Sequence, residues 1–567
     1  MPRMTGGEAI IRMLQAHGIE LAFGMGGFQL LPYYDALARQ DQIRHLLIRD
    51  ERDGAFAADG YARIRNRPAV ADATLGPGAT NLITAAAESF NASIPLVLLT
   101  GEVNSGISGR GATQESDQFG MLAPTTKLSV RIDRIERIPE QVRRAIGAAT
   151  GGRPGPVHVD IAEDVAHGEF DFQADEFVAD PLDCRVGGHR IGPDPSAVRD
   201  AARLVAGARA PVILAGGGIH LSEAYEELRD FAETGGIPVA TTISGKGAIA
   251  ETHPLALGVC GRFSRFANDF IRAADLLIVV GSKLGEIATN RWTLLQQGIP
   301  LVRIDIDPLE LTRYQRSSVG IWADASLALR SLTDELRDDQ TSKARRPGRA
   351  IEVATSREQW MSRTAAQRQS DEEPMQVARV LHEVMRVLPS ETILVADGGF
   401  AAHWSAIFYD VPKAGRQYIA NRGHASIGYG LPGAIGARLA APDVPVVALC
   451  GDNGFAMCVA ELETARRANA PVIALVLNNS AIGYVKALQH GLYEDRFLSV
   501  DFLEVDFAAA ARAFGCEGRT VTKPDELAPA LRESVAATVP TVLDIQVTRD
   551  PGRMLPGVDS RIAAAMD

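Results

Sequence analysis

The sequence predicts an α/β protein built from three doubly wound, mainly parallel sheets. Short β-branched runs alternate with longer amphipathic stretches, which is typical of alternating strands and helices. The strand candidates are continuous rather than alternating in polarity, as expected for strands that helices cover on both faces. The length of 567 residues corresponds to about three domains of ordinary size.

The strand candidates fall into three groups along the chain. The first group is IELAFGM, RHLLIR, AVADAT, PLVLLTG and PVHVDIA. The second is PVILAGG, IPVATTI, LLIVVG and LVRIDID, and the third is TILVADGG, VPVVALCGD, PVIALVLNN and TVLDIQVT. Two polar or richly charged segments, at about 168–195 and 336–373, indicate linkers. We therefore expect domains at 1–167, 191–335 and 374–550, followed by a short tail at 551–567.

The composition excludes several classes of protein. With 46% hydrophobic and 23% charged residues the chain is of the ordinary globular kind. The net charge of −12 argues against a nucleic-acid partner, because proteins that bind nucleic acids usually have a concentrated basic face. The N-terminus lacks the apolar block of a signal peptide, and no apolar run approaches the ~18 residues of a membrane span, so we expect a cytoplasmic protein. Five scattered cysteines without a CxxC pair indicate reduced, mostly buried thiols.

The most informative residues follow strand candidates of the third group. Ligands bind beyond the carboxyl ends of parallel strands, and here VPVVALC runs into GDNGF while PVIALVL ends in Asn478 and Asn479. The 24 residues between Asn453 and Asn478 suffice for one helix and one returning strand, which brings Asp452 and Asn479 to the same edge. Mg²⁺ prefers such hard oxygen ligands. The alternative is that Asp452 only caps a helix and the asparagines only form a turn.

A second acidic residue stands out in the first domain. Glu51 follows the strand candidate HLLIR, and the segment RDGAFAADGYAR after it has the spacing of an alanine-rich helix. Such a helix leaves little water near the carboxyl group, which favours sharing a proton with a partner. The alternative is a solvated glutamate, since Arg49, Asp50, Arg52 and Asp53 surround it.

Several segments resemble the acetolactate synthase-like family of thiamin diphosphate enzymes. IRDERDGAFAADGYAR resembles the family's glutamate segment, and ATLGPGATNLITAAAESFNASIPLVLLTGEV resembles its glycine-rich turn and the helix that follows. GRPGPVHVDIAEDV is similar to the closing strand of the same domain, and IGYGLPGAIGARLAAPDVPVVALCGDNGF to the pyrophosphate-binding domain. The resemblance covers about residues 4–550 in the family's order. Asn453 departs from the family's Gly-Asp-Gly motif, but the proposed side-chain ligands are intact.

The resemblance implies a pyrimidine-binding, a middle and a pyrophosphate-binding domain, with thiamin diphosphate and Mg²⁺ as cofactors. It makes Glu51 the proton-relay residue that contacts the cofactor's aminopyrimidine ring, and Asp452, Asn479 and the backbone of Ala481 the metal ligands. It places Gln114 near the reacting carbon, although Thr113 replaces a frequent phenylalanine; the alternative is that Gln114 is a surface residue. The other expected cofactor-binding residues are Pro77, Asn81, Gly399, His403, Ala425 as backbone acceptor for the amino group, Ile427 as the apolar wedge that bends the cofactor, Gly451, Asn453, Gly454 and Ile482.

The resemblance also implies an assembly, because the family's glutamate and metal site come from different chains. We therefore expect a homodimer or homotetramer. For the middle domain, AGGGIH lacks the GxGxxG spacing of a dinucleotide loop and indicates a tight strand-to-helix turn. GSKLGEIATNRW departs from the Arg-Phe-Asp-Asp run of FAD-binding relatives, so FAD or an adenine nucleotide is not favoured there.

The predicted function is that of a 2-oxoacid decarboxylase or carboligase acting on a small 2-oxoacid, aldehyde or ketone. Phe28, Gln29 and Thr113 would reshape the substrate pocket, which argues against branched-chain amino-acid synthesis; the alternative is that these side chains pack elsewhere. A close alternative is a 2-hydroxyacyl-CoA lyase or an oxalyl-CoA decarboxylase-type enzyme with an acyl-CoA substrate. A catalytically silent binding partner is disfavoured because Glu51 and Asp452 are both present, and an NAD-dependent oxidoreductase because its fingerprint is missing.

Overall fold

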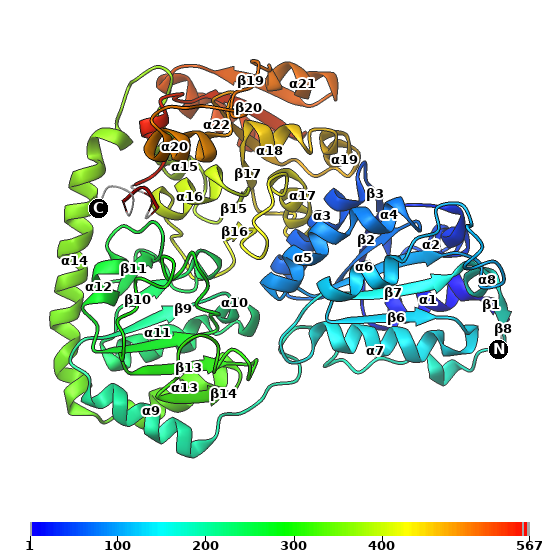
Figure 1. Ribbon diagram of the computed structural model, residues 1–567, viewed down its shortest axis with the longest axis horizontal. Helices are drawn as coiled ribbons and strands as arrows, with labels where there is room; N and C mark the ends of the chain where they lie inside the picture. Colours follow the sequence, from blue (N-terminus) through cyan, green and yellow to red (C-terminus); the bar gives the residue numbers. More distant parts are fainter. Residues whose placement is uncertain (1–2, 558, 560, 564–567) are drawn as a thin grey trace.

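Three six-stranded parallel sheets, each covered by helices, form the architecture of the chain (Figure 1). The computed structural model describes residues 3–557, 559 and 561–563, apart from the side chains of residues 342, 343 and 346. The sheets follow one another along the sequence, and a two-stranded antiparallel pair, β1 (Met4–Thr5) with β8 (Glu169–Phe170), closes the first domain. The predicted fold class is therefore confirmed.

The first and third sheets share one strand order. Numbered by their appearance within each sheet, the strands run 2-1-3-4-6-5 in both. The first sheet consists of β3 (Arg44–Leu47), β2 (Leu21–Met25), β4 (Ala69–Ala73), β5 (Leu96–Glu102), β7 (Val157–Ala162) and β6 (Leu128–Ile132). The third consists of β16 (Tyr418–Ala420), β15 (Ile393–Ala396), β17 (Val446–Gly451), β18 (Ile473–Asn478), β20 (Thr541–Gln546) and β19 (Glu517–Val521). In both sheets the strand order reverses next to the first strand, between β2 and β4 and between β15 and β17. Ligands bind at this switch point in such folds.

The middle sheet has a different order, 3-2-1-4-5-6. It consists of β11 (Ala256–Val259), β10 (Val239–Thr241), β9 (Pro211–Ala215), β12 (Leu276–Val280), β13 (Leu301–Asp305) and β14 (Val319–Trp322). Its strand order reverses between β9 and β12. The predicted tight turn after β9 is present, because a Cβ atom at Gly216 would lie 2.2 Å from the carbonyl oxygen of Gly281.

Helices cover the faces of each sheet. Those of the first domain are α1 (Gly6–Ala16), α2 (Leu31–Ala38), α3 (Glu51–Arg65), α4 (Pro77–Asn81), α5 (Ile83–Ala92), α6 (Gln118–Leu122), α7 (Ile138–Thr150) and α8 (Glu163–His167). Those of the middle domain are α9 (Pro195–Gly207), α10 (Gly218–Ser222), α11 (Tyr225–Gly235), α12 (Ala267–Arg272) and α13 (Ala325–Leu336). Those of the third are α15 (Val377–Val387), α16 (Phe400–Phe408), α17 (Gly430–Ala440), α18 (Asp452–Ala456), α19 (Glu461–Arg467), α20 (Gly483–Tyr493), α21 (Phe507–Ala513) and α22 (Pro524–Ala536).

The charged segment at about 336–373, expected as a linker, is largely one long helix. α14 (Gln340–Arg368) runs along the edge of the molecule from the middle to the third domain (Figure 1). Val353 and Trp360 bury an apolar stripe of this helix in the core that these two domains share. The abundance of charge reflects the solvated face of a helix rather than a flexible connection.

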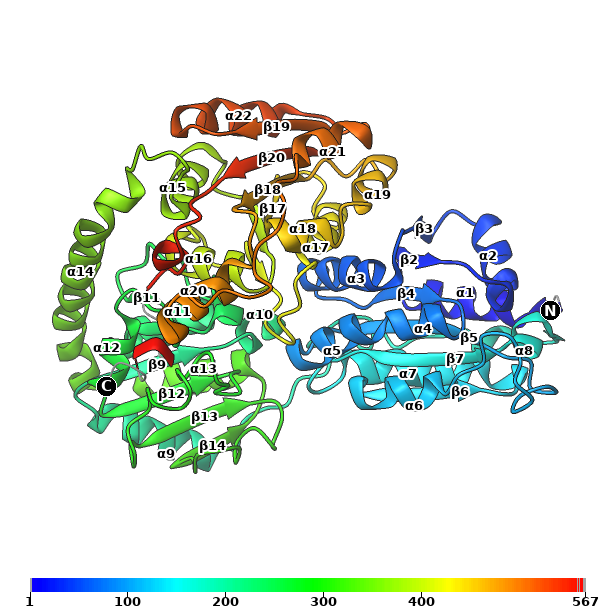
Figure 2. The same cartoon turned by 45° about the horizontal axis from the view of Figure 1, so that its top comes forward.

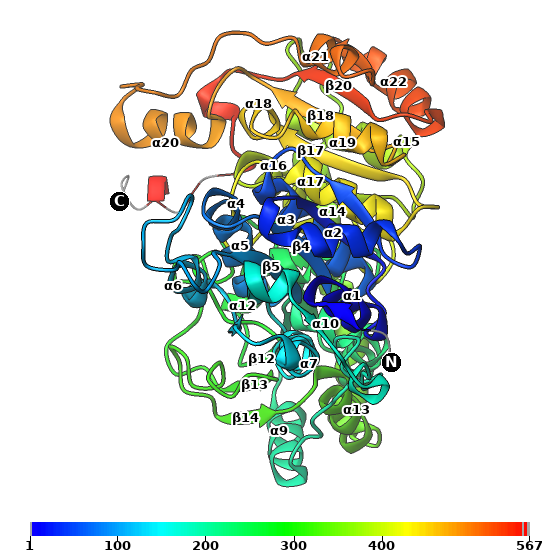
Figure 3. The same cartoon turned by 90° about the vertical axis from the view of Figure 1, so that its right-hand side faces the viewer.

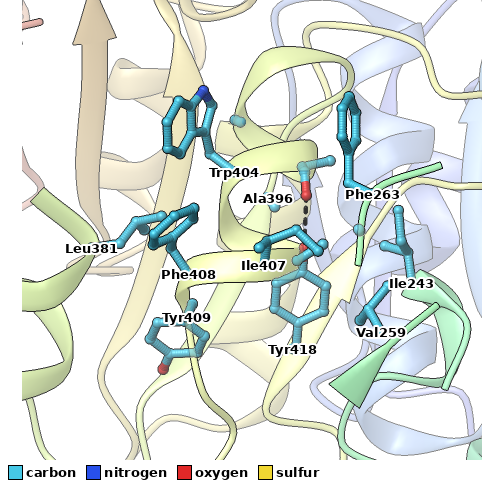
Figure 4. Packing of buried hydrophobic residues seen from close by; sticks show 14 of the residues in the cluster. Ile243, Val259, Phe263, Leu381, Ala396, Trp404, Ile407, Phe408, Tyr409 and Tyr418 are labelled. Carbon is cyan, nitrogen blue, oxygen red and sulfur yellow. Dashed lines mark hydrogen bonds between the residues drawn. The ribbon is translucent and has the colours of Figure 1, made fainter. Parts of the chain in front are cut away.

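The third domain packs against both others through continuous apolar cores. Toward the middle domain, Ile243, Val259 and Phe263 face Trp404 and Ile407 across the interface (Figure 4). Toward the first domain, α3 crosses α17 at very close range (Figure 2), because Cβ atoms at Gly60 and Gly436 would lie 2.2 and 1.8 Å from backbone oxygens of the other helix. One chain is therefore a single rigidly packed unit.

The described part of the segment expected as a tail packs against the fold. The Trp404 indole donates to the Met554 carbonyl oxygen at 2.9 Å, and the Tyr484 hydroxyl donates to Asp559 at 2.8 Å. Ile562 contacts Gly491 of α20, and the last described residues lie beside this helix (Figure 3). Within the described residues no helix is long and apolar enough to cross a membrane. All five cysteines are free, and four of them are buried, as predicted.

Candidate functional site

The carboxyl ends of β17 and β18 form the core of one candidate site. The two strands are neighbours, so Asp452 and Asn479 lie at the same sheet edge. The Asp452 carboxylate accepts the backbone N–H groups of Asn453 at 2.7 Å, Asn479 at 3.2 Å and Ala481 at 3.3 Å. Asp452 begins α18, which ends at Ala456; the single helix expected after Gly454 is divided into α18 and α19.

These groups fit a magnesium ion. Asp452 is buried and its pKa is raised by burial, although the three N–H groups oppose the rise, so a cation beside it would compensate a desolvated charge. In the part of the chain that the structure describes, the buried side-chain nitrogen of Asn479 has no hydrogen-bond partner. Among the described residues no three His, Cys, Asp or Glu side chains cluster as for a zinc site. One carboxylate with amide and carbonyl oxygens is instead the donor set that Mg²⁺ prefers.

The loop between β16 and α17 lies beside this edge. Ala425 has a left-handed backbone with φ of 60°, and Ile427 is half-buried. Asp397, at the end of β15, accepts the N–H groups of Gly428 at 3.2 Å and Tyr429 at 2.9 Å. Burial raises the pKa of Asp397 to about 6, although these N–H groups oppose the rise. Asp397 therefore fixes the end of the loop that follows Ile427.

The expected diphosphate contacts surround the same edge. Gly399 caps α16 with φ of 65°, and Ile482 caps α20. Gly454 lies so close to Asp397 that a Cβ atom there would be 1.9 Å from a carboxylate oxygen. Helix starts with free N–H groups favour phosphate. His403 is buried between the rings of Phe263 and Tyr484, and burial, with Arg422 and Arg262 nearby, holds its pKa well below the usual range.

The Glu51 carboxyl group forms the core of a second candidate site in the first domain. Glu51 is the first residue of α3, after Asp50 caps the helix, and only 5% of it is exposed. The side-chain amide of Asn81 donates to its carboxylate at 3.0 Å. A Cβ atom at Gly78 would come within 3.1 Å of the other carboxylate oxygen. The carboxyl group is thus buried beside the turn that begins at Pro77, and not solvated.

A loop after β5 covers this turn. Gln114 is exposed and has φ of 64°, and its backbone lies against Gly76, the residue before Pro77. Thr113 is also exposed. Gln118, which the sequence did not single out, anchors the loop: it accepts the Gly76 N–H at 2.9 Å and donates to the Gly101 carbonyl oxygen at 2.8 Å.

The proposed substrate determinants near β2 separate in space. The Gln29 side chain accepts a hydrogen bond from the Thr74 hydroxyl at 2.9 Å, close to the Gly76 turn. The Phe28 side chain is 58% exposed and stacks on His167, with ring centroids 5.4 Å apart. Gln29 therefore lies beside the first-domain site, whereas Phe28 lies farther out.

Helix α3 carries Glu51 at one end and supports the loop that contains Ala425 at the other. Arg63, near the end of α3, binds Glu88 at 3.0 Å, and Glu88 in turn holds the loop that contains Ala425. Glu51 is at the other end of α3, 12 residues or about 18 Å along the helix axis from Arg63. Glu51 and the Ala425 loop thus lie toward opposite ends of one helix.

The switch point of the middle sheet contains a separate cavity of about 310 Å³. Its lining includes the glycine turns after β9 and β12, the side chains of Lys283 and Asp305, and Arg153 from the first domain. Desolvation lowers the pKa of Lys283 to about 8.

Comparison with known proteins identifies the chain along its whole length. Family models of the thiamine pyrophosphate enzymes match in three parts: the N-terminal TPP binding domain at 4–121, the central domain at 198–332 and the C-terminal TPP binding domain at 397–545. The probable acetolactate synthase large subunit of Methanocaldococcus jannaschii is 36% identical, over 98% of this chain and 93% of its own.

Two further relatives cover nearly as much of the chain. The acetolactate synthase large subunit of Corynebacterium glutamicum is 34% identical over 97% of this chain and 87% of its own. Acetolactate synthase isozyme 1 large subunit of Escherichia coli is 31% identical over 96% and 94%. The chain therefore belongs to the acetolactate synthase-like family of thiamin diphosphate-dependent enzymes.

Proposed function

We propose that this protein is a thiamin diphosphate- and Mg²⁺-dependent enzyme that makes or breaks a carbon–carbon bond next to a carbonyl group. The observation that supports it most is the arrangement of Asp452, Asn479 and Ala481 at the adjoining ends of β17 and β18. These residues lie in the segment that the C-terminal TPP binding domain matches. A buried carboxylate with neutral oxygen donors is suited to a metal-bound diphosphate.

Each site residue has a role in this proposal. When bound, thiamin diphosphate supplies a ring that adds to a carbonyl and accepts the electron pair of the bond that breaks. Asp452, the Asn479 amide oxygen and the Ala481 carbonyl oxygen would hold Mg²⁺. Glu51 would hold or release a proton at the pyrimidine nitrogen, and Gln114 would orient the substrate carbonyl. The Ala425 carbonyl oxygen would accept a hydrogen bond from the amino group of the pyrimidine, and the Ile427 side chain would pack against the cofactor.

A second copy of the chain completes the site in this proposal. Glu51 and the Ala425 loop lie toward opposite ends of α3, so one chain offers its Glu51 to one cofactor and its Asp452 to another. A homodimer, or a dimer of dimers, brings one of each together. Exposed apolar side chains at Met457 and Leu503 of the third domain are suited to burial against that copy.

For the reaction we propose a 2-oxoacid decarboxylase or carboligase. The relatives carry the name acetolactate synthase, and Gln29 lies beside the Glu51 turn where it can contact a small substrate. A second candidate is a lyase for 2-hydroxyacyl- or oxalyl-CoA. The cavity between the first and middle domains favours it, because Lys283 and Arg153 line the cavity and would bind the phosphates of CoA.

A paired assay tests the proposal. Purified full-length protein with thiamin diphosphate and Mg²⁺ is given pyruvate or a 2-hydroxyacyl-CoA, and carbon dioxide or aldehyde release is measured. Mass spectrometry of small molecules released from the protein identifies what it retains. We expect retained thiamin diphosphate and turnover of the 2-oxoacid; turnover of the acyl-CoA alone selects the second candidate. A wild-type protein that binds no thiamin diphosphate would refute both.

A further inference from the structure

The loop between β16 and α17 is held at both ends by buried carboxylates. At the C-terminal end of the loop, Asp397 from the same domain accepts the N–H groups of residues 428–430 at 2.9–3.3 Å. At its N-terminal end, Glu88 from α5 of the first domain accepts the N–H groups of residues 423–425. Ser426 and Ile427 stand between these two anchors. The resulting geometry of residues 425–427 thus depends on two domains.

Glu88 makes an unusual set of contacts for a fully buried carboxylate. It accepts three successive backbone N–H groups: those of Gly423 at 2.9 Å, His424 at 2.5 Å and Ala425 at 3.2 Å. Gly423 packs so tightly on α5 that a Cβ atom there would lie 2.1 Å from the Glu88 carbonyl oxygen. Ala425 has a positive φ, which a non-glycine residue keeps only when its surroundings impose it.

Arg63 balances the negative charge of Glu88. Arg63 donates to Glu88 at 3.0 Å and forms a second ion pair with Asp59, and all three side chains are buried. Asp59 in turn accepts the hydroxyl groups of Tyr429 and Ser89, each at 2.7 Å. A buried, fully paired network of this kind allows one arrangement of its members. Arg63 therefore holds the Glu88 carboxylate in place, while the same carboxylate accepts the N–H groups of the loop.

We propose that Glu88 is a positioning residue that sets the cofactor-bending loop of its own chain. This inference rests on the proposed function, because it assigns to Glu88 the placement of the Ala425 carbonyl and of Ile427 toward the aminopyrimidine. An ionised carboxylate has several acceptor positions and no donor, so it satisfies three N–H groups and Arg63 together. Glutamine at this position would present an N–H₂ group to at least one backbone N–H or to Arg63.

Hydrogen exchange of the loop tests the inference directly. Full-length wild type, Glu88→Gln and Ser89→Ala are compared without and with thiamin diphosphate and Mg²⁺, and exchange is read for the peptide 421–430. We expect the 423–425 amides of Glu88→Gln to exchange at least about tenfold faster even without cofactor, the factor for one lost hydrogen bond to a charged group. The half-saturating thiamin diphosphate concentration should rise by a similar factor.

Ser89→Ala is the matched control, because it removes one hydrogen bond to Asp59, which Arg63 and Tyr429 continue to hold, and removes no side-chain contact of Glu88 or of the loop. We expect its loop exchange and cofactor affinity to match the wild type. Unchanged exchange in Glu88→Gln, or equal acceleration in both variants, would overturn the inference. If Glu88→Gln does not fold, Glu88→Asp is measured instead. Its shorter side chain should speed loop exchange, and wild-type exchange would overturn the inference. A wild type that binds no cofactor refutes the proposed function but leaves the exchange comparison valid.

Discussion

Glu51 and Asp452 are two buried carboxylates whose surroundings suit different roles. Asp452 accepts three backbone N–H groups, which oppose the rise in its pKa that burial causes, and a cation beside it would oppose that rise further. Glu51 contacts one neutral amide, from Asn81, and is otherwise enclosed by the turn at Gly78. These different surroundings support the different roles proposed above, proton relay for Glu51 and metal binding for Asp452.

Replacing Glu51 by Gln should abolish most of the turnover while thiamin diphosphate still binds. The amide keeps the size of the side chain and its contact with Asn81 but cannot transfer the proton. General acid–base groups contribute about 10²–10⁴-fold, so we expect a loss in kcat of that size. Equilibrium dialysis measures cofactor retention alongside. Full turnover in the variant would remove Glu51 from the reaction.

Replacing Asp452 by Ala should instead weaken the retention of metal and cofactor together. Dialysis of the wild type against a chelator should release Mg²⁺ and then thiamin diphosphate, and the variant should lose both without the chelator. Asp443→Ala, at an exposed position shortly before β17, is the control and should behave as the wild type. Equal retention in the Asp452 variant and the control would contradict the metal assignment.

His45 should make stability depend on pH. Burial disfavours its protonated form, but the Asp72 carboxylate 3.0 Å away outweighs burial and raises the pKa of His45 above 6.5. A raised pKa means that protonation stabilises the folded state below about pH 6.5, and that this contribution disappears as the pH rises through the folded value. Urea unfolding of the wild type and His45→Gln should therefore differ more at about pH 5.5 than at about pH 9. A difference that grows with pH would contradict this assignment.

The sequence locates the residues that follow strands but not those that support them. Asp452 and Asn479 could be predicted because parallel strands end at one edge, which is a local rule. Glu88 could not be predicted, because it lies in the middle of a helix and its partners in the loop are more than 330 residues away in the sequence. Its only signal is one acid in the small-residue run TAAAESF. Asp397 did have a signal, because it ends the strand candidate TILVADGG.

At the scale of elements, the strands that sequence patterns miss are edge strands. The interior strands of all three six-stranded sheets were predicted, since both of their faces are covered and they are mainly apolar. Within these sheets the missed strands are β6, β11, β14, β16 and β19, and each lies at the edge of its sheet. Most are short or half-exposed; β16 has only three residues, and EGRTV of β19 lacks a continuous apolar run. The charged α14 was missed for a related reason, since only one stripe of it is buried.

The crossing of α3 with α17 should tolerate no side chain at its centre. A Cβ atom at Gly436 would lie 1.8 Å from the Ala57 carbonyl oxygen, so Gly436→Ala must separate the helices and should lower the free energy of unfolding by about 1–3 kcal/mol. Gly348→Ala, in α14 with open space around it, is the control and should be neutral or stabilising by up to about 1 kcal/mol. Denaturant unfolding compares the two. Equal stability of both variants would show that the crossing can relax.

At the scale of the whole molecule, α3 joins two candidate sites. Its first residue is Glu51, and near its last turn Arg63 and Glu88 hold the loop of the third domain. The first and third domains repeat one strand order, so each presents a switch point for one end of a ligand. The packing of α3 on α17 keeps these two switch points of one chain at a fixed relative position (Figure 2). This arrangement supports the proposal that two copies of the chain bring a Glu51 and an Asp452 to the same cofactor.

Complementation between two inactive variants tests this arrangement most directly. Glu51→Gln and Asp452→Ala chains with different tags are expressed together, the mixed dimers are isolated, and 2-oxoacid turnover is measured. If each active site combines Glu51 of one chain with Asp452 of the other, one of the two sites in a mixed dimer is intact, and about half of the wild-type activity should return. If the mixed dimers are as inactive as either variant alone, both residues serve one site within a single chain, and the account given above is wrong.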